Sequence, residues 1–490
     1  MDLSWLLLLL LLLFLLFLGD SLLVNVSGNI VFPVQHKFKG RERNLSALKA
    51  HDVRRHGRFL FDIDLELGGN GQPSETGLYF AKLGLGSPPK DYYVQVDTGS
   101  DILWVNCVGC KSCPKKSGLG LDLTLYDPKS SSTSSSVACD QAFCTSTYNG
   151  QLTGCRPDVL CQYEVVYGDG SSTSGYFVND NVQFDRVTGN LQTAPGNGSI
   201  IFGCGAKQSG ELGTSSEALD GILGFGQANS SMLSQLASAG KVKKIFAHCL
   251  DNVNGGGIFA IGEVVKPKVN TTPLVPNQAH YNVVLKEIEV GGDNLSLPSD
   301  VFDNGFRKGT IIDSGTTLAY LPQVVYGELM SKILAQQPGL KLRTVEQQFS
   351  CFQYNSGNVD DGFPTVKFYF EGSLSLTVYP HEYLFQISVS NNDNVWCFGW
   401  QNGGDQTKDG KDITLLGDLV LSNKLVLYDL EQQMIGWTEY NCSSSIKVKD
   451  SSGVAYSVGA HNLSSASTLI IGRKLTFLLL VIATLLSFIN

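Results

Sequence analysis

Short apolar runs, interrupted every few residues by Gly, Asn, Asp or Pro, dominate the chain between its two ends. Within these runs Val, Ile, Tyr and Phe stand at nearly alternating positions, which is the pattern of strands that bury one face. Helical signals are few and predict only two helices, at 231–239 and 323–336. The pattern predicts strands at 78–85, 92–96, 162–167, 198–202, 281–290, 365–370 and 424–430. The body of the protein is therefore expected to be all-β.

The two ends of the 490-residue chain have a different character. Residues 6–18 are an unbroken run of Leu and Phe, too short to cross a bilayer of ~30 Å but typical of a secretory signal, although no Lys or Arg precedes it. Residues 475–489 are apolar or small, and small residues stand about ten positions upstream, as a signal for a GPI anchor requires. A genuine membrane span is the alternative. We expect a signal peptide at 1–19, a Ser-rich stalk at 446–465 and a GPI signal at 466–490 that is removed. The anchor would then be attached at Ser464 or Ser465.

Sequons for N-glycosylation fit a secreted chain. Two precede the predicted body, at Asn25 and Asn44. The six expected to carry glycans are Asn197, Asn229, Asn270, Asn294, Asn441 and Asn462. Because the secretory route is oxidising, the twelve Cys should form disulfides.

The cysteines are concentrated in one part of the chain. Seven lie in a loop-rich insertion at 107–161, which we expect to be stapled by disulfides: Cys107, Cys110, Cys113, Cys139, Cys144, Cys155 and Cys161. The other five are Cys204, Cys249, Cys351, Cys397 and Cys442. The spacing at the start of the insertion also fits zinc or an iron–sulfur cluster, but no His stands at ligand spacing nearby. No metal and no other cofactor is therefore expected.

A duplicated motif carries the chemical signal. One apolar strand runs into Asp97-Thr98-Gly99-Ser100, and another runs into Asp313-Ser314-Gly315-Thr316. Each copy is followed downstream by an apolar strand that ends in Gly, Asp220-Gly221-Ile222-Leu223-Gly224 for the first and 414–417 for the second. A single Asp-Thr-Gly would be interpreted as a turn. Two copies, each with its partner strand, make chance a poor explanation.

The physical chemistry of such a pair is specific. A carboxyl group at the end of a buried strand needs hydrogen-bond donors or a shared proton, because an isolated buried charge is costly. Gly allows its backbone N–H to approach the carboxyl group, and the flanking hydroxyls supply further donors. If the two halves pack about a pseudo-twofold axis, Asp97 and Asp313 meet, and two carboxyl groups that close cannot both ionise. The pair can hold a water molecule, with one Asp removing its proton while the other polarises a carbonyl group.

These motifs, together with Tyr167-Gly168-Asp169-Gly170-Ser171, resemble those of the pepsin-like aspartic proteases over about residues 77–442. The resemblance implies a bilobal double β-barrel with a deep central cleft, one lobe at 76–272 and the other at 273–445. It implies that Asp97 and Asp313 are catalytic and that Tyr167 and Gly168 belong to a flap that closes over the substrate.

The same resemblance assigns supporting contacts. Trp104 should bond the hydroxyl of Tyr167, and Thr98 and Ser314 should brace the two active-site loops against each other. It also implies the disulfide Cys351–Cys397, while the other pairings stay open.

Within the family, Trp104-Val105-Asn106-Cys107 and the Cys-rich insertion resemble the nepenthesin-type, or atypical, plant branch, and the C-terminal signal resembles that of its GPI-anchored members. Residues 20–75 then resemble a pro-segment, because 36–58 is rich in Lys and Arg. In related zymogens such a segment pairs with the acidic body and blocks the cleft until acid loosens it. A solvated amphipathic helix is the alternative for this segment.

The net charge of the chain limits the classes of molecule that it can bind. The chain has 36 basic against 45 acidic residues, a net charge of −9, which argues against nucleic acid. We expect a monomeric aspartic endopeptidase that acts on polypeptides at acidic pH, held at the outer face of the plasma membrane or in the cell wall. One alternative is a catalytically weak homologue that binds or inhibits another protein. Another is a glycosidase, although the two Asp motifs do not offer the different environments of an acid and a nucleophile. The scattered His residues, including His248, are expected to be structural or exposed.

Overall fold

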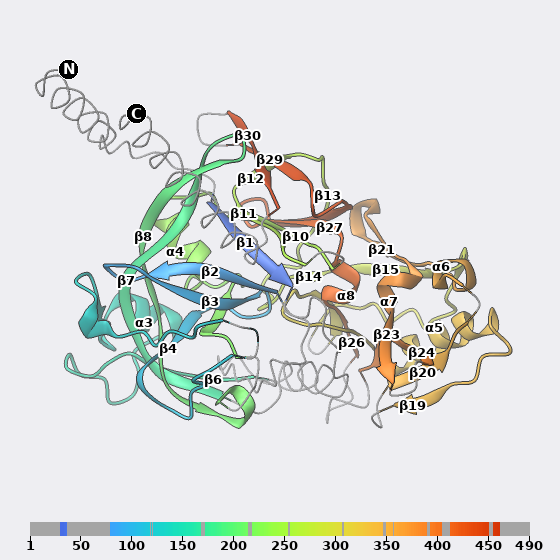
Figure 1. The fold of residues 1–490 in the computed structure, drawn as a ribbon, viewed down its shortest axis with the longest axis horizontal. Coiled ribbons are helices and arrows are strands. Elements are labelled where there is room, and N and C mark those ends of the chain that lie inside the picture. The colour runs from blue at the N-terminus through green and yellow to red at the C-terminus, as the bar shows by residue number, and fades with distance from the viewer. Residues whose placement is uncertain are drawn as a thin grey trace, which may run out of the picture.

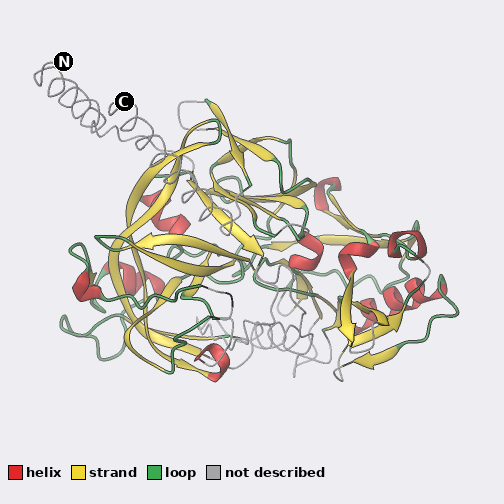
Figure 2. Ribbon diagram, in the orientation of Figure 1, coloured by secondary structure: helices red, strands yellow, loops and turns green. Residues whose placement is uncertain are grey.

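The structure is a computed structural model that describes residues 30–36 and 79–460, apart from short gaps at 118, 120, 168–171, 214–217, 253–254, 306–307, 346–348, 356, 390–392, 404–411 and 450–453. Strands predominate in it and the helices are short (Figure 2), which confirms the all-β prediction. Two lobes are visible in Figure 1, one blue to green and one yellow to orange, and strands from both meet between them.

The N-terminal lobe is built on a fourteen-stranded sheet to which the C-terminal part of the chain contributes two strands. Its strands are β1 (Ile30–His36), β2 (Tyr79–Leu85), β3 (Lys90–Asp97), β4 (Leu103–Lys111), β5 (Ser135–Ser136), β6 (Gln162–Val166), β7 (Ser172–Gly189), β8 (Gln192–Ser209), β9 (Gly221–Gly224), β10 (Ile245–Leu250), β11 (Gly257–Ile261), β13 (Asn270–Pro273), β27 (Lys424–Asp429) and β28 (Met434–Glu439). Strand β10 pairs with β11 on one side and with β27 on the other, so the two lobes share this sheet.

The C-terminal lobe consists of smaller sheets. Strands β14 (Asn282–Val283), β17 (Lys308–Ile312), β18 (Ala319–Leu321), β25 (Trp400–Asn402) and β26 (Asp412–Leu416) form one of them. The others contain β15 (Leu285–Val290), β16 (Asp293–Asn294), β21 (Val366–Phe370) and β22 (Ser375–Val378), or β19 (Arg343–Val345), β20 (Phe349–Gln353), β23 (Leu384–Val389) and β24 (Asp393–Phe398). The predicted strand at 281–290 is divided here, because β14 pairs with β17 whereas β15 pairs with β21.

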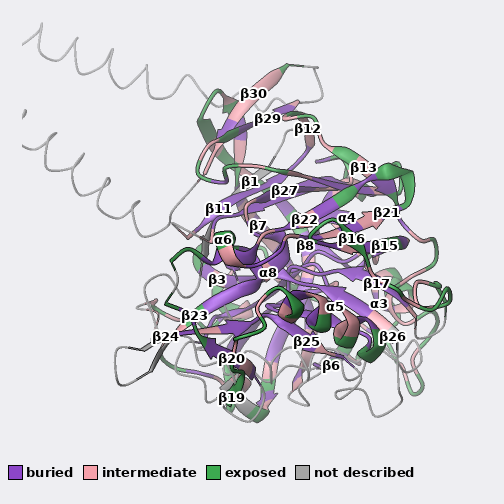
Figure 3. Cartoon of the chain, turned by 90° about the vertical axis from the view of Figure 1, so that its right-hand side faces the viewer, coloured by how far each residue is buried: buried purple, intermediate pink, exposed green. Residues whose placement is uncertain are grey.

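Helices lie outside the sheets. The two predicted helices are α4 (Met232–Ser238), which Ser231 caps through its side chain, and α5 (Gln323–Ala335). The remaining helices are α3 (Ala142–Thr147), α6 (Val359–Gly362), α7 (Pro380–Tyr383) and α8 (Asp418–Leu421), with 3-10 turns η2 (Pro128–Ser130), η3 (Gly210–Gly213) and η4 (Glu371–Ser373). Most strands at the centre of the molecule are buried, while green exposed segments lie toward the periphery (Figure 3).

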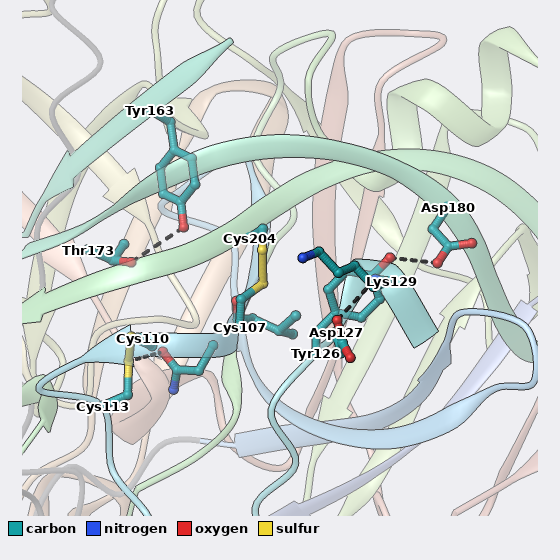
Figure 4. The surroundings of a disulfide bond; sticks show 12 residues. Cys107, Cys110, Cys113, Tyr126, Asp127, Lys129, Tyr163, Thr173, Asp180 and Cys204 are labelled. Carbon is teal, nitrogen blue, oxygen red and sulfur yellow. Dashed lines mark hydrogen bonds between the residues drawn. A yellow bond between two sulfur atoms is a disulfide. The ribbon is translucent and has the colours of Figure 1, made fainter. Parts of the chain in front are cut away.

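The Cys-rich insertion is cross-linked as expected. Its disulfides are Cys107–Cys204, Cys110–Cys113, Cys139–Cys155 and Cys144–Cys161. Figure 4 shows the Cys107–Cys204 bond close to Tyr126, whose hydroxyl donates a 2.6 Å hydrogen bond to Asp180 on β7. The insertion is therefore attached to the long β7–β8 hairpin by a covalent bond and by a buried polar contact.

The prediction of a stalk at 446–465 is wrong for its first part. Strands β29 (Ser445–Lys449) and β30 (Ala455–Gly459) form a hairpin that extends a small sheet with β12 (Glu263–Lys266). The physical reason is an alternating pattern in a Ser-rich setting: Ile446, Val448 and Val458 are buried in one cluster with Cys442. Residues 461–465 lie outside the described part of the chain.

Both apolar termini lie outside the described residues, as do Asn25, Asn44, Asn462 and the expected attachment site at Ser464 or Ser465. In the part of the chain that the structure describes, no helix is long and apolar enough to cross a bilayer.

Candidate active site

The first motif lies at the end of β3, beside β9. The two strands are parallel, and Asp97 stands opposite Gly224. Asp97 is fully buried; its Oδ1 accepts a 2.7 Å bond from the N–H of Gly99, and its Oδ2 accepts one from the Ser100 hydroxyl. A Cβ at Gly224 would lie 2.4 Å from the backbone of Asp101, so only glycine permits this close packing.

The second motif repeats the first. It follows β17, which pairs in parallel with β26. Asp313 is fully buried; its Oδ1 accepts from the N–H of Gly315 at 2.8 Å and its Oδ2 from the Thr316 hydroxyl at 2.7 Å. A Cβ at Gly417 would lie 2.4 Å from the carbonyl oxygen of Thr316, so this glycine has the same packing role as Gly224. Both carboxyl groups are thus held in matching orientations by one backbone donor and one hydroxyl donor.

The two loops touch each other directly. The hydroxyl oxygen of Thr98 accepts a 2.9 Å hydrogen bond from the backbone N–H of Ser314, although the residues are 216 positions apart. The resemblance implied that Thr98 and Ser314 each brace the other loop, but only the Thr98 side chain does so. The buried Ser314 hydroxyl has no hydrogen-bond partner among the described residues, so it does not return the contact. Thr98 therefore joins the two loops through its hydroxyl.

Tyr167, which the resemblance assigns to a flap, makes the expected contact with Trp104. The indole N–H of Trp104 donates a 2.7 Å hydrogen bond to the hydroxyl of Tyr167, and both side chains are buried. Gly168 and the rest of the predicted flap lie outside the described residues. Tyr167 is thus connected to β4 through Trp104, seven residues after Asp97.

Two further carboxyl groups lie beside the first loop, those of the half-buried Asp101 and the buried Asp220, and sequence reasoning missed both as site residues. Asp101 accepts from the N–H of Ala228 at 2.9 Å, and burial raises its pKa to about 6 against the opposing effects of that bond and of Lys244. Asp220 accepts from the N–H groups of Tyr93 and Thr124, both at 2.7 Å, and burial raises its pKa to about 7. Asp220 stood in the sequence as the first residue of the Gly-strand motif, which was the available signal.

The other predicted site residues are the disulfide cysteines and the sequon asparagines. The disulfide Cys351–Cys397 is present, and a sixth bond, Cys249–Cys442, ties β10 to the segment after β28. The five described sequon residues are all exposed: Asn197, Asn229, Asn270, Asn294 and Asn441. Among the described residues, no three His, Cys, Asp or Glu side chains come together as a group that could hold a metal ion.

Paired Asp-hydroxyl-Gly-hydroxyl loops, one from each of two lobes that share a sheet, define the class of pepsin-like aspartic protease folds. Comparison with known families places the chain in that class. The family described as "Xylanase inhibitor N-terminal" matches residues 79–263, and the one described as "Xylanase inhibitor C-terminal" matches residues 280–439. The chain belongs to the pepsin-like aspartic protease family.

Curated relatives agree with this placement. Aspartic proteinase 36 of Arabidopsis thaliana is 56% identical over 93% of this chain and 92% of its own length, and Aspartic proteinase 39 of the same plant is 54% identical over 92% and 93%. Aspartic proteinase nepenthesin-2 of Nepenthes gracilis is 29% identical over 75% of this chain and 79% of its own. These similarities support a plant peptidase.

Solved structures support the fold alone. The crystal structure of edgp has a TM-score of 0.61 at 19% identity, covering 86% of this chain and 96% of that one. Basic 7S globulin from soybean has a TM-score of 0.58 at 21% identity, covering 85% and 96%.

Proposed function

We propose that the chain is an aspartic endopeptidase that hydrolyses peptide bonds at acidic pH with a water molecule activated between Asp97 and Asp313. The observation that carries the proposal is the pair of equivalent loops. Each loop buries one carboxyl group, supplies it with one N–H and one hydroxyl donor, and contacts the other loop through Thr98. The similarity to the two Arabidopsis aspartic proteinases supports the same reaction class.

In the proposed mechanism the ionised carboxyl group removes a proton from the water while the protonated one donates to the carbonyl oxygen of the scissile bond. The water oxygen bonds to the carbonyl carbon and a tetrahedral diol forms. The C–N bond then breaks as the nitrogen accepts the proton that the first carboxyl group took from the water. At the same time one diol hydroxyl gives its proton to the other carboxylate, so a carboxylic acid product forms and the pair returns to its starting state. Acidic pH is required because one of the two carboxyl groups must carry a proton.

The test compares cleavage of an acid-denatured protein at pH ~4–5 by the wild-type chain, by Asp97→Asn and by Asp313→Asn. We expect each variant to lose at least about a thousandfold in kcat, because the dyad works as a unit. Asp140→Asn, at an exposed aspartate, is the matched control and should keep full activity. Pepstatin should inhibit the wild type. Equal cleavage by the wild type and Asp97→Asn would overturn the mechanism.

A second candidate function is binding or inhibition of another protein without catalysis. It is favoured by one observation, the match to the two families described as xylanase inhibitor. The same experiment separates the two functions. A purified wild-type chain without cleavage at any acidic pH, combined with inhibition of an added xylanase, would support the second function.

We further propose that residues 20–75 are a pro-segment that the mature enzyme loses. Strand β1 supports this, because it lies between β2 and β11 in the shared sheet and also pairs with β7. A segment held in this way can keep the precursor in a defined inactive state. A mature N-terminus near residue 20–30, determined by mass spectrometry, would contradict the proposal.

Secretion, glycosylation at the exposed sequons and a GPI anchor at the outer face of the plasma membrane are also proposals. They rest on the two apolar termini and on the exposed positions of the described sequon residues. Release from membranes by a phosphatidylinositol-specific phospholipase would support the anchor. Retention of the chain after that treatment, with release by detergent alone, would favour a membrane span.

A further inference from the structure

A basic face lies on the small sheet of β12, β29 and β30. Lys447 on β29 is exposed, whereas its neighbours Ile446 and Val448 point inward and are buried. Lys266 on β12 stands directly opposite Lys447 and is also exposed. Like charges that face each other across two strands destabilise a sheet. The sheet therefore carries a pair of lysines that its own stability does not explain.

The positive charge of this face is only partly neutralised. Glu263 forms ion pairs with Lys243 at 2.6 Å and with Lys449 at 2.5 Å. Among the described residues, no carboxylate lies within ion-pair distance of Lys266 or Lys447. In a chain with a net charge of −9, this face is a local excess of positive charge. It is complementary to an anionic surface.

An exposed leucine lies beside these lysines. Leu191, in the turn between β7 and β8, is 68% exposed. A Cβ at Gly459 would lie 3.1 Å from Cδ2 of Leu191. Gly459 stands opposite Ser445, two residues before Lys447, so Leu191 lies on the same side of the hairpin as that lysine. Apolar and basic side chains on one face are typical of surfaces that lie against a bilayer.

The backbone holds Leu191 at the surface in an unfavourable conformation. Its φ is 55°, in the left-handed region that suits glycine but not leucine. The N–H of Leu191 donates a 2.7 Å bond to the carbonyl oxygen of Ser457, and the N–H of Ser457 donates a 2.9 Å bond to the side-chain oxygen of Asn190. These bonds attach the turn to β30. A strained residue that the surrounding structure keeps in place points to a function for its side chain.

A groove of about 530 Å³ lies between this turn and the hairpin. Val187 and Leu191 contribute apolar surface to it, and Ser444, Ser445 and Ser457 also line it. Serine hydroxyl groups can donate hydrogen bonds to phosphate oxygens. The groove therefore offers polar groups suited to a phospholipid headgroup next to the apolar side chain of Leu191.

The described part of the chain ends on this face. Its last residue, Ala460, lines the groove. The expected anchor site at Ser464 or Ser465 follows within five residues, so at most ~18 Å of extended chain separates the face from the anchor. An anchor at either position would keep this face close to the headgroups.

We propose that the face formed by Leu191, Lys266 and Lys447 lies against the phospholipid headgroups of the bilayer to which the chain is attached. This inference rests on the proposed membrane attachment and is independent of the proposed catalysis. The small sheet lies at one end of the molecule, away from β3 and β26 beside the aspartate loops (Figures 1 and 3). Contact through this face would therefore hold the aspartate loops away from the bilayer.

The experiment measures by mass spectrometry how fast an amine-acetylating reagent modifies each lysine of the full chain. The chain is labelled on walled plant cells, on wall-free protoplasts, after detergent extraction, and after reconstitution into vesicles of phosphatidylcholine and phosphatidylglycerol. Lys266 and Lys447 should react about fivefold more slowly on protoplasts and on vesicles than in detergent. Lys115 and Lys116, exposed in the Cys-rich insertion, are the internal controls and should react equally in all four states.

A double variant tests whether the face itself causes the protection. Leu191→Gly/Lys447→Gln removes the apolar side chain and one charge, and glycine suits the positive φ at this position. We expect Lys266 of this variant to react as fast on protoplasts as in detergent. The matched control is Lys341→Gln/Leu342→Gly, which makes the same two changes at exposed residues of the C-terminal lobe and should leave the protection intact.

Each other outcome overturns the inference in a recognisable way. Equal reactivity of Lys266 on protoplasts and in detergent, or protection that survives in Leu191→Gly/Lys447→Gln, would overturn it while the membrane attachment stands. Protection on walled cells alone would assign the face to an acidic wall polysaccharide, and protection on protoplasts without protection on vesicles would assign it to a membrane protein. A chain absent from the membrane fraction would overturn both this inference and the proposed attachment, but not the proposed catalysis.

Discussion

Asp220→Asn should change how the stability of the fold depends on pH. The Asp220 carboxyl group is 1% exposed and accepts from the N–H groups of Tyr93 and Thr124, so it holds β3 and the Cys-rich insertion together beside the Asp97 loop. Burial raises its pKa from 3.8 to about 7. The folded state binds this proton more tightly than the unfolded state does. The contribution of Asp220 to the free energy of unfolding is therefore fully present below pH ~4 and is lost as the pH rises through 7.

The magnitude follows from the shift. About three pKa units at 1.36 kcal/mol each give a loss on the order of 4 kcal/mol for the wild type between pH 4 and pH 8. An Asn at position 220 carries no charge at either pH but keeps only one acceptor, so one backbone N–H loses its partner at a cost of about 1–3 kcal/mol. Asp220→Asn should therefore be less stable than the wild type at pH 4 and more stable at pH 8.

The assay is urea unfolding followed by tryptophan fluorescence at pH 4 and pH 8 with the disulfides intact. Both proteins carry Asp313→Asn to prevent self-cleavage, and this shared change cancels in the comparison. Asp140→Asn, at an exposed position, serves as the control and should have the same free energy of unfolding as its parent at either pH. If the difference in unfolding free energy between Asp220→Asn and its parent is the same at both pH values, burial does not raise the pKa of Asp220.

Three further outcomes are expected. Trp104→Phe removes the donor to the Tyr167 hydroxyl and should lower kcat/KM for a peptide about tenfold in steady-state kinetics; an unchanged value would contradict the role of this contact. Lys424→Met leaves the buried Glu382 carboxylate without its 2.5 Å ion pair and should lower the free energy of unfolding in urea by about 3–5 kcal/mol. Adding Glu382→Leu should restore most of this loss. A double variant as unstable as Lys424→Met would contradict the explanation by an unpaired buried charge. Cys442→Ser opens a disulfide that links residues 193 positions apart, and should lower the free energy of unfolding by about 3–5 kcal/mol in the same assay. It should also make residues 443–460 sensitive to limited proteolysis. An unchanged digestion pattern would contradict the role of this disulfide in holding the segment.

Several elements could be predicted because their signals are local. The alternation of apolar residues identified β2, β3, β21 and β27 to within two residues at either end. The hairpin at β29 and β30 was missed because Ser and Lys dominate its composition, while its few inward residues pack on β12, which is far away in the sequence. The division of 281–290 also escaped prediction, since both halves are extended and only their pairing partners differ.

The two aspartate loops can be predicted from local sequence. Asp, Gly and the hydroxyl residues that hold each carboxyl group lie within four consecutive positions, so local backbone geometry is enough to bring them together. The contacts that hold the loops to each other depend on the packing of the two lobes. Thr98 meets Ser314 across 216 positions and His248 meets Tyr428 across 180, and such contacts exist only when strands from both lobes enter one sheet. The same reason applies to Asp220, whose raised pKa comes from burial by segments that no local pattern specifies.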